Sequence, residues 1–207
     1  INGATWSTDV PTVPFQPQTR AELQAAVDLW ETDNATALST YGEINYWDVS
    51  LITDMSNLFS EKSNFNGDIS NWDVSNVTDM NGMFFEASSF SGDLSSWDVS
   101  NVTNMSNLFM RANQFSADLS NWDVSQVVAM SQMFRDAPNF NADISNWDVS
   151  SATEIWSMFR SALSFNQDLS SWNISNVTDM TGIFEGTPLS DENKCAIHTS
   201  WSTNSSW

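Results

Sequence analysis

A 25-residue unit recurs six times in this chain without insertion or deletion, and no other feature limits the fold as strongly. One tryptophan column marks the copies: Trp47, Trp72, Trp97, Trp122, Trp147 and Trp172. An aliphatic column keeps the same step: Ile44, Ile69, Leu94, Leu119, Ile144 and Leu169. Two phenylalanine columns do likewise: Phe59, Phe84, Phe109, Phe134, Phe159 and Phe184, and Phe65, Phe90, Phe115, Phe140 and Phe165. A single unit cannot bury these residues alone, so the repetition predicts a solenoid of stacked copies.

The copy from Asp68 to Phe90 indicates what each unit should form. Apolar and polar residues alternate at Trp72-Asp73-Val74, which predicts a short strand with Asp73 outward and its two neighbours inward. The spacing of apolar residues then becomes three, three and four, which predicts a short helix. The buried face of that helix would hold Val77, Met80, Met83, Phe84 and Ala87. The expected fold is therefore an α/β solenoid with one short parallel strand and one short helix in each 25-residue repeat.

The N-terminal part departs from the period and should form a cap. Thr19 and Glu22 have the spacing of a capping box ahead of periodic apolar residues, which predicts a helix from about 20 to 31. That helix belongs to a helical cap at 19–41. Residues 1–18 contain Pro11, Pro14 and Pro17, and we expect them to form an extended lead-in.

The C-terminal part should form a second cap. The solenoid is expected to occupy 42–189, because the period fails after Phe184. Ser190 followed by Asp191 and Glu192 predicts the start of a helix in a cap at 190–207. Such caps are needed because an open last repeat would expose an apolar cross-section.

The repeated motif F-N-x-D-I-S-N-W-D-V-S-N-V-T-x-M-x-x-M-F-x-x-A resembles the BspA-like leucine-rich-repeat surface proteins of bacteria, mycoplasmas and some microbial eukaryotes. The resemblance covers residues 42–189, and its I-x-x-W-x-V-x-x-V part has the spacing of a leucine-rich-repeat strand. It implies a right-handed superhelix in a secreted or cell-surface protein, for which adhesion or matrix binding is the usual supposition. It brings no catalytic motif. The last copy departs from the motif at Asn173, where it reads W-N-I-S.

The charge of the chain limits its partners. Its 26 acidic and 6 basic residues give a formal net charge of −20. A surface of this kind repels nucleic acid and anionic membranes and suits cations or a basic partner. No apolar run approaches the roughly 20 residues of a membrane span, so we expect no direct membrane insertion. A single cysteine, Cys195, excludes an intrachain disulfide.

An outward acidic column is the first candidate binding surface. It contains Asp48, Asp73, Asp98, Asp123 and Asp148, and outward residues beside it include Asn71, Asn121 and Asn146. These oxygens suit three roles: an internal hydrogen-bonded ladder, Ca²⁺ binding along the strip, or direct contact with a partner. If cations bind there, millimolar Ca²⁺ should raise the melting temperature over that of a chelated sample. No other cofactor and no specific metal site is predicted.

A second acidic column precedes the aliphatic residues and should accept hydrogen bonds at a turn. It contains Glu43, Asp68, Asp93, Asp118, Asp143 and Asp168. Successive strand-paired carboxylates would lie about 4.8 Å apart, so each repeat needs a contact that offsets their repulsion.

The segment after the first phenylalanine column varies between copies and is the second candidate binding surface. It carries Arg111, Arg135 and Arg160, together with Lys62 and Phe85. Trp156 stands alone in a column otherwise filled by small polar residues, and Tyr46 and Trp207 are further aromatic residues expected at the surface. Variable chemistry on a regular scaffold is typical of a binding edge, and drift on a solvated loop is the alternative.

Nothing in the sequence predicts an enzyme. Cys195 and His198 fall on one predicted helix without a third orienting group, and identical acidic columns lack the two unlike environments that an acid and a base need. We expect a monomeric segment of a larger surface protein that binds an extracellular protein, glycan or matrix. A structural spacer without a specific ligand and a regular-surface binder, for example of ice, are the alternatives.

Overall fold

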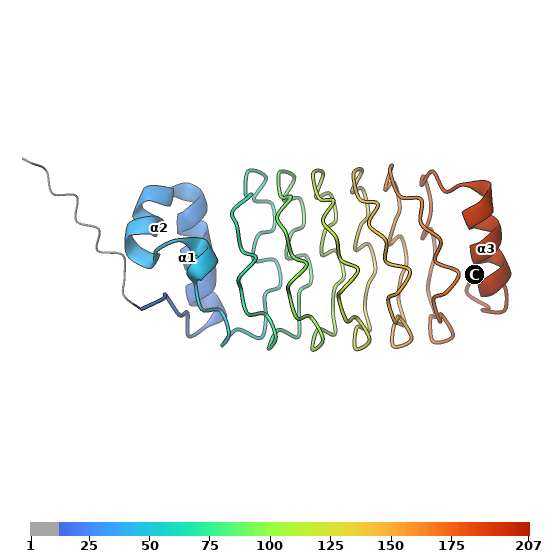
Figure 1. Cartoon of the computed structure of the whole chain (residues 1–207), viewed down its shortest axis with the longest axis horizontal. Helices are drawn as coiled ribbons and strands as arrows, with labels where there is room; N and C mark the ends of the chain where they lie inside the picture. The colour runs from blue at the N-terminus through green and yellow to red at the C-terminus, as the bar shows by residue number, and fades with distance from the viewer. Residues whose placement is uncertain (1–12) are drawn as a thin grey trace, which may run out of the picture.

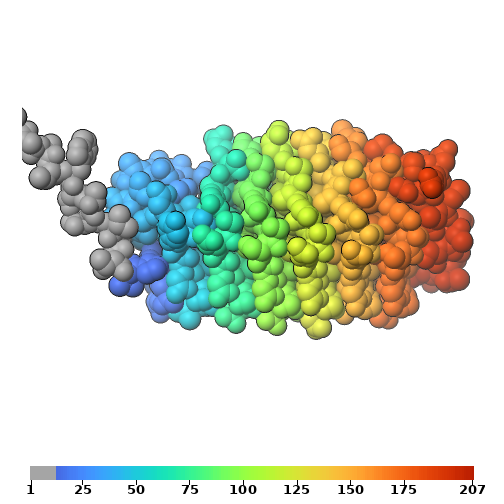
Figure 2. All heavy atoms as spheres, viewed as in Figure 1, coloured from blue at the N-terminus to red at the C-terminus, as the bar shows by residue number. Residues whose placement is uncertain are grey.

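The computed structural model describes residues 13–207, so the prediction for residues 1–12 lies outside it. In chain order its helical elements are α1 (Arg20–Thr32), α2 (Asn34–Tyr41), the short 3₁₀ helix η1 (Ile44–Tyr46) and α3 (Asp191–Trp201). Between α2 and α3 the chain winds into coils that lie side by side in an elongated stack (Figure 1). Consecutive copies form adjacent bands on the surface (Figure 2). The prediction of a solenoid is confirmed. Within this part of the chain, no helix has the length and hydropathy that a membrane span requires.

Helix α1 begins where the capping-box spacing indicates. The Thr19 hydroxyl oxygen accepts the backbone N–H of Glu22 at 3.2 Å. The Glu22 carboxylate in turn accepts the backbone N–H of Gln18 at 2.7 Å, so its return bond goes to the residue before the N-cap. The inner face of α1 is buried in the common core through Leu23, Ala26 and Val27.

Helix α2 and the segment before α1 complete the N-terminal cap. Helix α2 falls within 19–41, where only the helix at about 20–31 was predicted individually, and it begins at Asp33, whose carboxylate accepts the N–H of Thr36 at 3.1 Å. Phe15 packs edge-on against Trp47, with ring centroids 5.4 Å apart. Its carbonyl accepts the N–H of Asp48 at 2.9 Å. The described part of the lead-in therefore lies against the first coil.

Helix α3 closes the other end of the stack. Its N-cap is Ser190, whose hydroxyl oxygen accepts the N–H of Asn193 at 3.2 Å, as the sequence predicts. Ile197 and Trp201 are its buried residues. The Trp201 ring stacks on that of Trp172 at 6.3 Å, so it occupies the place of a further repeat's tryptophan.

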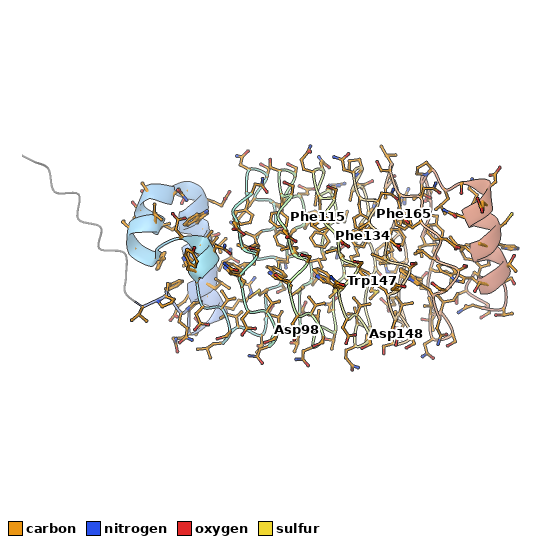
Figure 3. The ribbon with its side chains drawn as sticks, in the orientation of Figure 1. Asp98, Phe115, Phe134, Trp147, Asp148 and Phe165 are labelled. Atoms are coloured by element: carbon orange, nitrogen blue, oxygen red, sulfur yellow. The ribbon has the colours of Figure 1, made fainter. Side chains whose placement is uncertain are left out.

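The interior consists of parallel columns of rings. The phenylalanines stack from coil to coil, with centroid separations of 5.5 Å for Phe84–Phe109 and 5.8 Å for Phe109–Phe134. The tryptophans form a second column, in which Trp147 lies 6.5 Å from Trp122, and the column's side chains are only 2–4% exposed. Figure 3 shows the labelled phenylalanines and Trp147 within the stack, and Asp98 and Asp148 lower on the coils. Apolar burial and ring stacking therefore hold the copies in register.

Backbone hydrogen bonds join neighbouring coils along the segment that the sequence predicts to be helical. The N–H of Met80, for example, donates to the carbonyl of Asn104 in the next coil at 2.9 Å. Isolated parallel bridges follow the same line through Asp54, Asp79, Asn104, Ala129, Glu154 and Asp179. The predicted helix at 77–87 is therefore wrong, because consecutive turns, such as Met83 N–H to Met80 C=O at 3.1 Å, bury the same side chains.

Left-handed residues explain why these turns do not become a helix. Two positions per coil have φ between 53° and 76°. One column contains Asn57, Gly82, Asn107, Gln132, Ser157 and Gly182, and the other Glu61, Glu86, Arg111, Asp136, Ser161 and Gly186. Each such residue reverses the right-handed curvature of the turn before it. At Gly82 a side chain would also collide with its neighbour, since an added Cβ would lie 2.5 Å from the Asn57 carboxamide oxygen.

The W-D-V segment is not a strand either, and the predicted strand at 72–74 is wrong. The N–H of Trp72 closes a turn onto the carbonyl of Ile69 at 3.1 Å. The link to the preceding coil comes from the side chain, because the indole N–H of Trp72 donates to the Ile44 carbonyl at 2.8 Å. The same bond, at 3.0–3.1 Å, is made by Trp97, Trp122, Trp147 and Trp172. The predicted directions are confirmed, since Trp72 and Val74 are buried and Asp73 is exposed.

Other polar side chains bond to the preceding coil on the same side of the stack. The Asn76 side-chain amide donates to the carbonyl of Ser50 at 2.9 Å, and the Asn101 amide donates to that of Ser75 at 2.8 Å. The hydroxyl of Ser96 reaches a preceding carbonyl in the same way. Side-chain donors therefore do on this side what backbone N–H groups do on the other.

Candidate binding surface

The first acidic column lies at the surface in local turns rather than in a ladder between repeats. One Asp73 carboxylate oxygen accepts both the backbone N–H of Ser75, at 3.1 Å, and its hydroxyl, at 2.6 Å. This contact of a carboxylate with the residue two positions later is an Asx turn. Equivalent bonds to the backbone N–H two residues later are made by Asp48, Asp98, Asp123, Asp148 and Asn173. The predicted hydrogen-bonded role holds, but the partner is in the same copy.

The second acidic column forms the same turn. Asp68 accepts the backbone N–H of Ser70 at 3.0 Å. The matching turns begin at Asp93, Asp118, Asp143 and Asp168. In the first coil, the Asn45 amide also donates to Asp68 at 2.7 Å. The expectation of turn hydrogen bonds in this column is confirmed at these positions.

A third column of Asx turns was missed by reasoning from the sequence. Asp79 accepts the backbone N–H of Asn81 at 2.8 Å. The same contact begins at Asp54, Asn104 and Asp179. The sequence signal was an Asp or Asn followed two residues later by Ser, Asn or Thr, which is the signal that the other two columns share.

Hydrogen bonds keep several of these carboxyl groups acidic. The Ser100 hydroxyl and then its N–H lower the pKa of Asp98. For Asp68, the N–H and hydroxyl of Ser70 lower the pKa against the raising effects of burial and of the Asp93 charge. The pKa is also lowered in Asp48, Asp93, Asp118, Asp143 and Asp148. The hydrogen bonds therefore outweigh the repulsion within the columns, and these groups are ionised at neutral pH.

The asparagines predicted beside the first column do not share a ligand set with it. The backbone N–H of Asn71 donates to the Asn45 side chain at 2.9 Å. Asn146 lines a shallow hollow of about 360 Å³ with Asp143 and Asp168, which belong to the second column. Asn121 is exposed at the equivalent position of the preceding copy.

Cation binding gains no support from the geometry. Among residues 13–207 no three His, Cys, Asp or Glu side chains come together as metal ligands. The carboxylates stand in single file along the stack, and the Ser75 hydroxyl, which could have been a further oxygen ligand, is bonded to Asp73.

The basic residues of the variable segment are held in ion pairs. The Arg111 guanidinium lies 2.5 Å from the Glu86 carboxylate and 3.6 Å from that of Asp136. Arg135 pairs with Asp136 at 3.4 Å, and the remaining pairs are Arg160 with Glu185 and Lys62 with Asp28. Arg111 and Arg160 therefore link neighbouring copies and Lys62 links α1 to the coils, whereas Arg135 pairs within its own copy.

The aromatic residues expected at the surface divide into two kinds. Tyr46 is 68% exposed and Trp207 is 40% exposed. Phe85 and Trp156 are only half-buried, and neither belongs to the large exposed apolar side chains. The Trp207 indole N–H donates to the ring of His198 at 2.8 Å, so that histidine holds the C-terminal tail.

Comparison with known protein families finds one family that matches two segments of this chain. Residues 31–137 and 113–205 each match the family described as "Mycoplasma protein of unknown function, DUF285". The chain belongs to this family. The two matched segments overlap and together run from the end of α1 to the C-terminal tail, so the DUF285 repeats are the coils described above. No curated protein and no solved structure matched the chain.

Proposed function

We propose that the chain is a non-catalytic binding module of the extracellular or cell-surface type, whose acidic face contacts a protein, glycan or matrix partner. The resemblance to BspA-like leucine-rich-repeat surface proteins supports this setting. The finer assignment to that group rests on the repeat motif alone.

One observation carries the proposal: exposed carboxylates occupy the same place in successive coils. Asp73, Asp98, Asp123 and Asp148 are all exposed, and their Asx turns fix each carboxylate on its coil. The chain as a whole carries a net charge of −20. A fixed row of like charges attracts a complementary row of basic groups and raises the rate of encounter with them.

The partner supported best is therefore a basic extracellular protein or matrix surface. Nucleic acids and anionic membranes are repelled by the same charge. A catalytic role has no support, because the acidic groups of each column sit in near-identical turns and offer no pair of unlike carboxyl groups.

Asparagine substitution separates charge from structure. Asn173 and Asn104 already form the turn, with bonds of 3.2 and 3.1 Å to the N–H two residues later. Replacing Asp73, Asp98, Asp123 and Asp148 together by Asn should keep the fold and remove the charged row. The measurement is binding to a printed array of extracellular proteins and glycans, with polylysine as a reference for charge alone.

The matched control replaces Asp68, Asp93, Asp118 and Asp143 by Asn, which changes the net charge equally. We expect the first variant to bind its partners at least tenfold more weakly than the unmodified chain. The control should bind them with unchanged affinity. Equal losses in the two variants would show that only net charge matters, and the proposal would fail.

A structural spacer is the second candidate, and the ion pairs favour it. Arg111 and Arg160 of the variable segment pair with carboxylates of neighbouring copies, which stiffens the stack. A spacer predicts no reproducible partner on the array for the unmodified chain.

A further inference from the structure

A large hollow lies between the last coil and the C-terminal tail. Its volume is about 780 Å³, within the range of roughly 300–1,000 Å³ found for ligand sites. It is lined by Trp172, Asn173, Ile174, Ser175, Val177 and Thr178 of the coil and by Ser200, Thr203, Asn204, Ser205 and Ser206 beyond it. None of these side chains is charged, in a chain with a net charge of −20.

The hollow exists because the tail imitates a further repeat without completing one. The Asn204 amide donates to the carbonyls of Ile174 and Val177 at 2.6 and 3.1 Å, as the asparagines of the coils do to their predecessors. The Ser206 hydroxyl donates to the Thr178 carbonyl at 2.9 Å. These two contacts hold the tail across the coil, and the space that a full coil would fill stays open.

Several polar groups in this space have no partner in the protein. Among residues 13–207, Asn173 uses only its carboxamide oxygen, which accepts the Ser175 N–H at 3.2 Å, and its amide N–H groups make no bond. The hydroxyls of Ser175, Thr203 and Ser205 also make no bond to another described side chain or carbonyl. Two amide donors and three hydroxyl groups therefore face solvent around one hollow.

Asn173 also marks the single place where the first acidic column loses its charge. Every other copy has Asp at this position, and only the copy beside the hollow has Asn. The exchange replaces a group that only accepts hydrogen bonds with one that donates and accepts. It removes the carboxylate that would otherwise have to give up its water when a ligand enters.

We propose that this hollow binds a neutral saccharide. Uncharged hydroxyl and amide groups that both donate and accept match the hydroxyls of a sugar. An anionic sugar would be repelled by the surrounding charge, and a cation would favour the acidic columns. This site is separate from the acidic face and stands without it.

The test uses a panel of neutral di- to tetrasaccharides built from glucose, galactose, mannose and N-acetylglucosamine, with sialylated and sulphated counterparts. Saturation-transfer difference NMR identifies a binder, and calorimetry gives its affinity. The variant Asn173→Leu removes the amide from the hollow. The matched control Asn104→Leu makes the same change in an earlier copy, outside the hollow, and each variant loses one Asx turn.

We expect a neutral oligosaccharide to bind the unmodified chain, its affinity to fall at least tenfold in Asn173→Leu, and Asn104→Leu to bind within twofold of the unmodified chain. A second variant, Ser205→Ala, should weaken the same sugar without changing the melting temperature. The proposal is overturned if no neutral member binds at millimolar concentration, if a charged member binds more tightly, or if the two leucine variants lose affinity equally.

Discussion

The two sides of each coil are joined to their neighbours by different chemistry. Along 54–62 and its equivalents, backbone N–H groups donate to the next coil, as Phe109 does to Met133 at 2.9 Å. Along 69–77 and its equivalents, side chains donate instead, as the Trp122 indole does to the Leu94 carbonyl at 3.0 Å. The first kind of link needs no particular side chain, whereas the second exists only if the right side chain is present.

This difference explains the pattern of the copies. The side with side-chain links reads N-W-D-V-S-N-V-T with few changes, because most of its letters have a hydrogen-bonding or packing task. The side with backbone links varies freely outside its buried columns, reading SEKSN, FEASS, MRANQ and RDAPN in successive copies. Variation on this repeat scaffold therefore has a backbone reason that does not depend on a binding role.

The largest expected effect comes from removing one indole donor. Trp122→Phe keeps a buried ring but leaves the Leu94 carbonyl without its partner, and should cost about 2–4 kcal/mol of unfolding free energy. Phe109→Leu on the side with backbone links removes volume and ring stacking but no hydrogen bond, and should cost about 1–2 kcal/mol. Chemical denaturation measures both, and equal costs would contradict the distinction between the two sides.

A smaller effect is expected from an exposed amide. Asn101→Ala removes the bond to the Ser75 carbonyl and should cost about 1 kcal/mol. Asn113 is also exposed and its side chain makes no such bond, so Asn113→Ala should stay within about 0.5 kcal/mol of the unmodified chain. Thermal melts of the two variants decide the point. A larger loss in Asn113→Ala would reverse the assignment of the links.

A stabilising change should be available on the side with backbone links. Ser157 has φ of 53°, and Ser157→Gly relieves the cost of that conformation, for a gain of about 0.5 kcal/mol. Ser106 does not have a positive φ, so the control Ser106→Gly should lose about 0.5–1 kcal/mol. Opposite signs are expected, and losses of the same size in both variants would count against the left-handed columns.

Acidification should change the stability less, for each residue that it protonates, than the substitutions above do. Because the pKa values of Asp68, Asp98 and Asp148 are lowered by folding, their stabilisation is present above the unfolded-state pKa near 4. It is lost as the pH falls through that value toward the lower folded-state values. Melting temperatures should therefore fall between about pH 5 and pH 2. A rise on acidification would mean that repulsion between the carboxylates outweighs their hydrogen bonds.

Burial could be predicted from the sequence, and secondary structure within the repeat could not. Trp72 inward and Asp73 outward follow from alternation alone, and the phenylalanine columns follow from the period. The same spacing fits a chain of turns as well as a strand and a helix, because all three bring the same residues to the core. The missed signals were Asp followed two residues later by Ser, and Asn57 sharing a column with Gly82, which indicates left-handed backbone.

The hollow beside Asn173 could not be predicted from the sequence. It depends on how the C-terminal tail folds back onto the last coil, and no local sequence pattern encodes that.

Hydrogen exchange followed by NMR tests most directly whether the two sides are linked differently. We predict that the indole N–H groups of Trp97, Trp122 and Trp147 exchange as slowly as the backbone amides of Phe109 and Phe134. The backbone amides of Asp98 and Asp123, which make no hydrogen bond to a described residue, should exchange within the first spectrum. Slow exchange at Asp98 and Asp123 together with fast exchange of the indoles would contradict the claim that the two sides are linked differently. A continuous backbone sheet would then run along the tryptophan side.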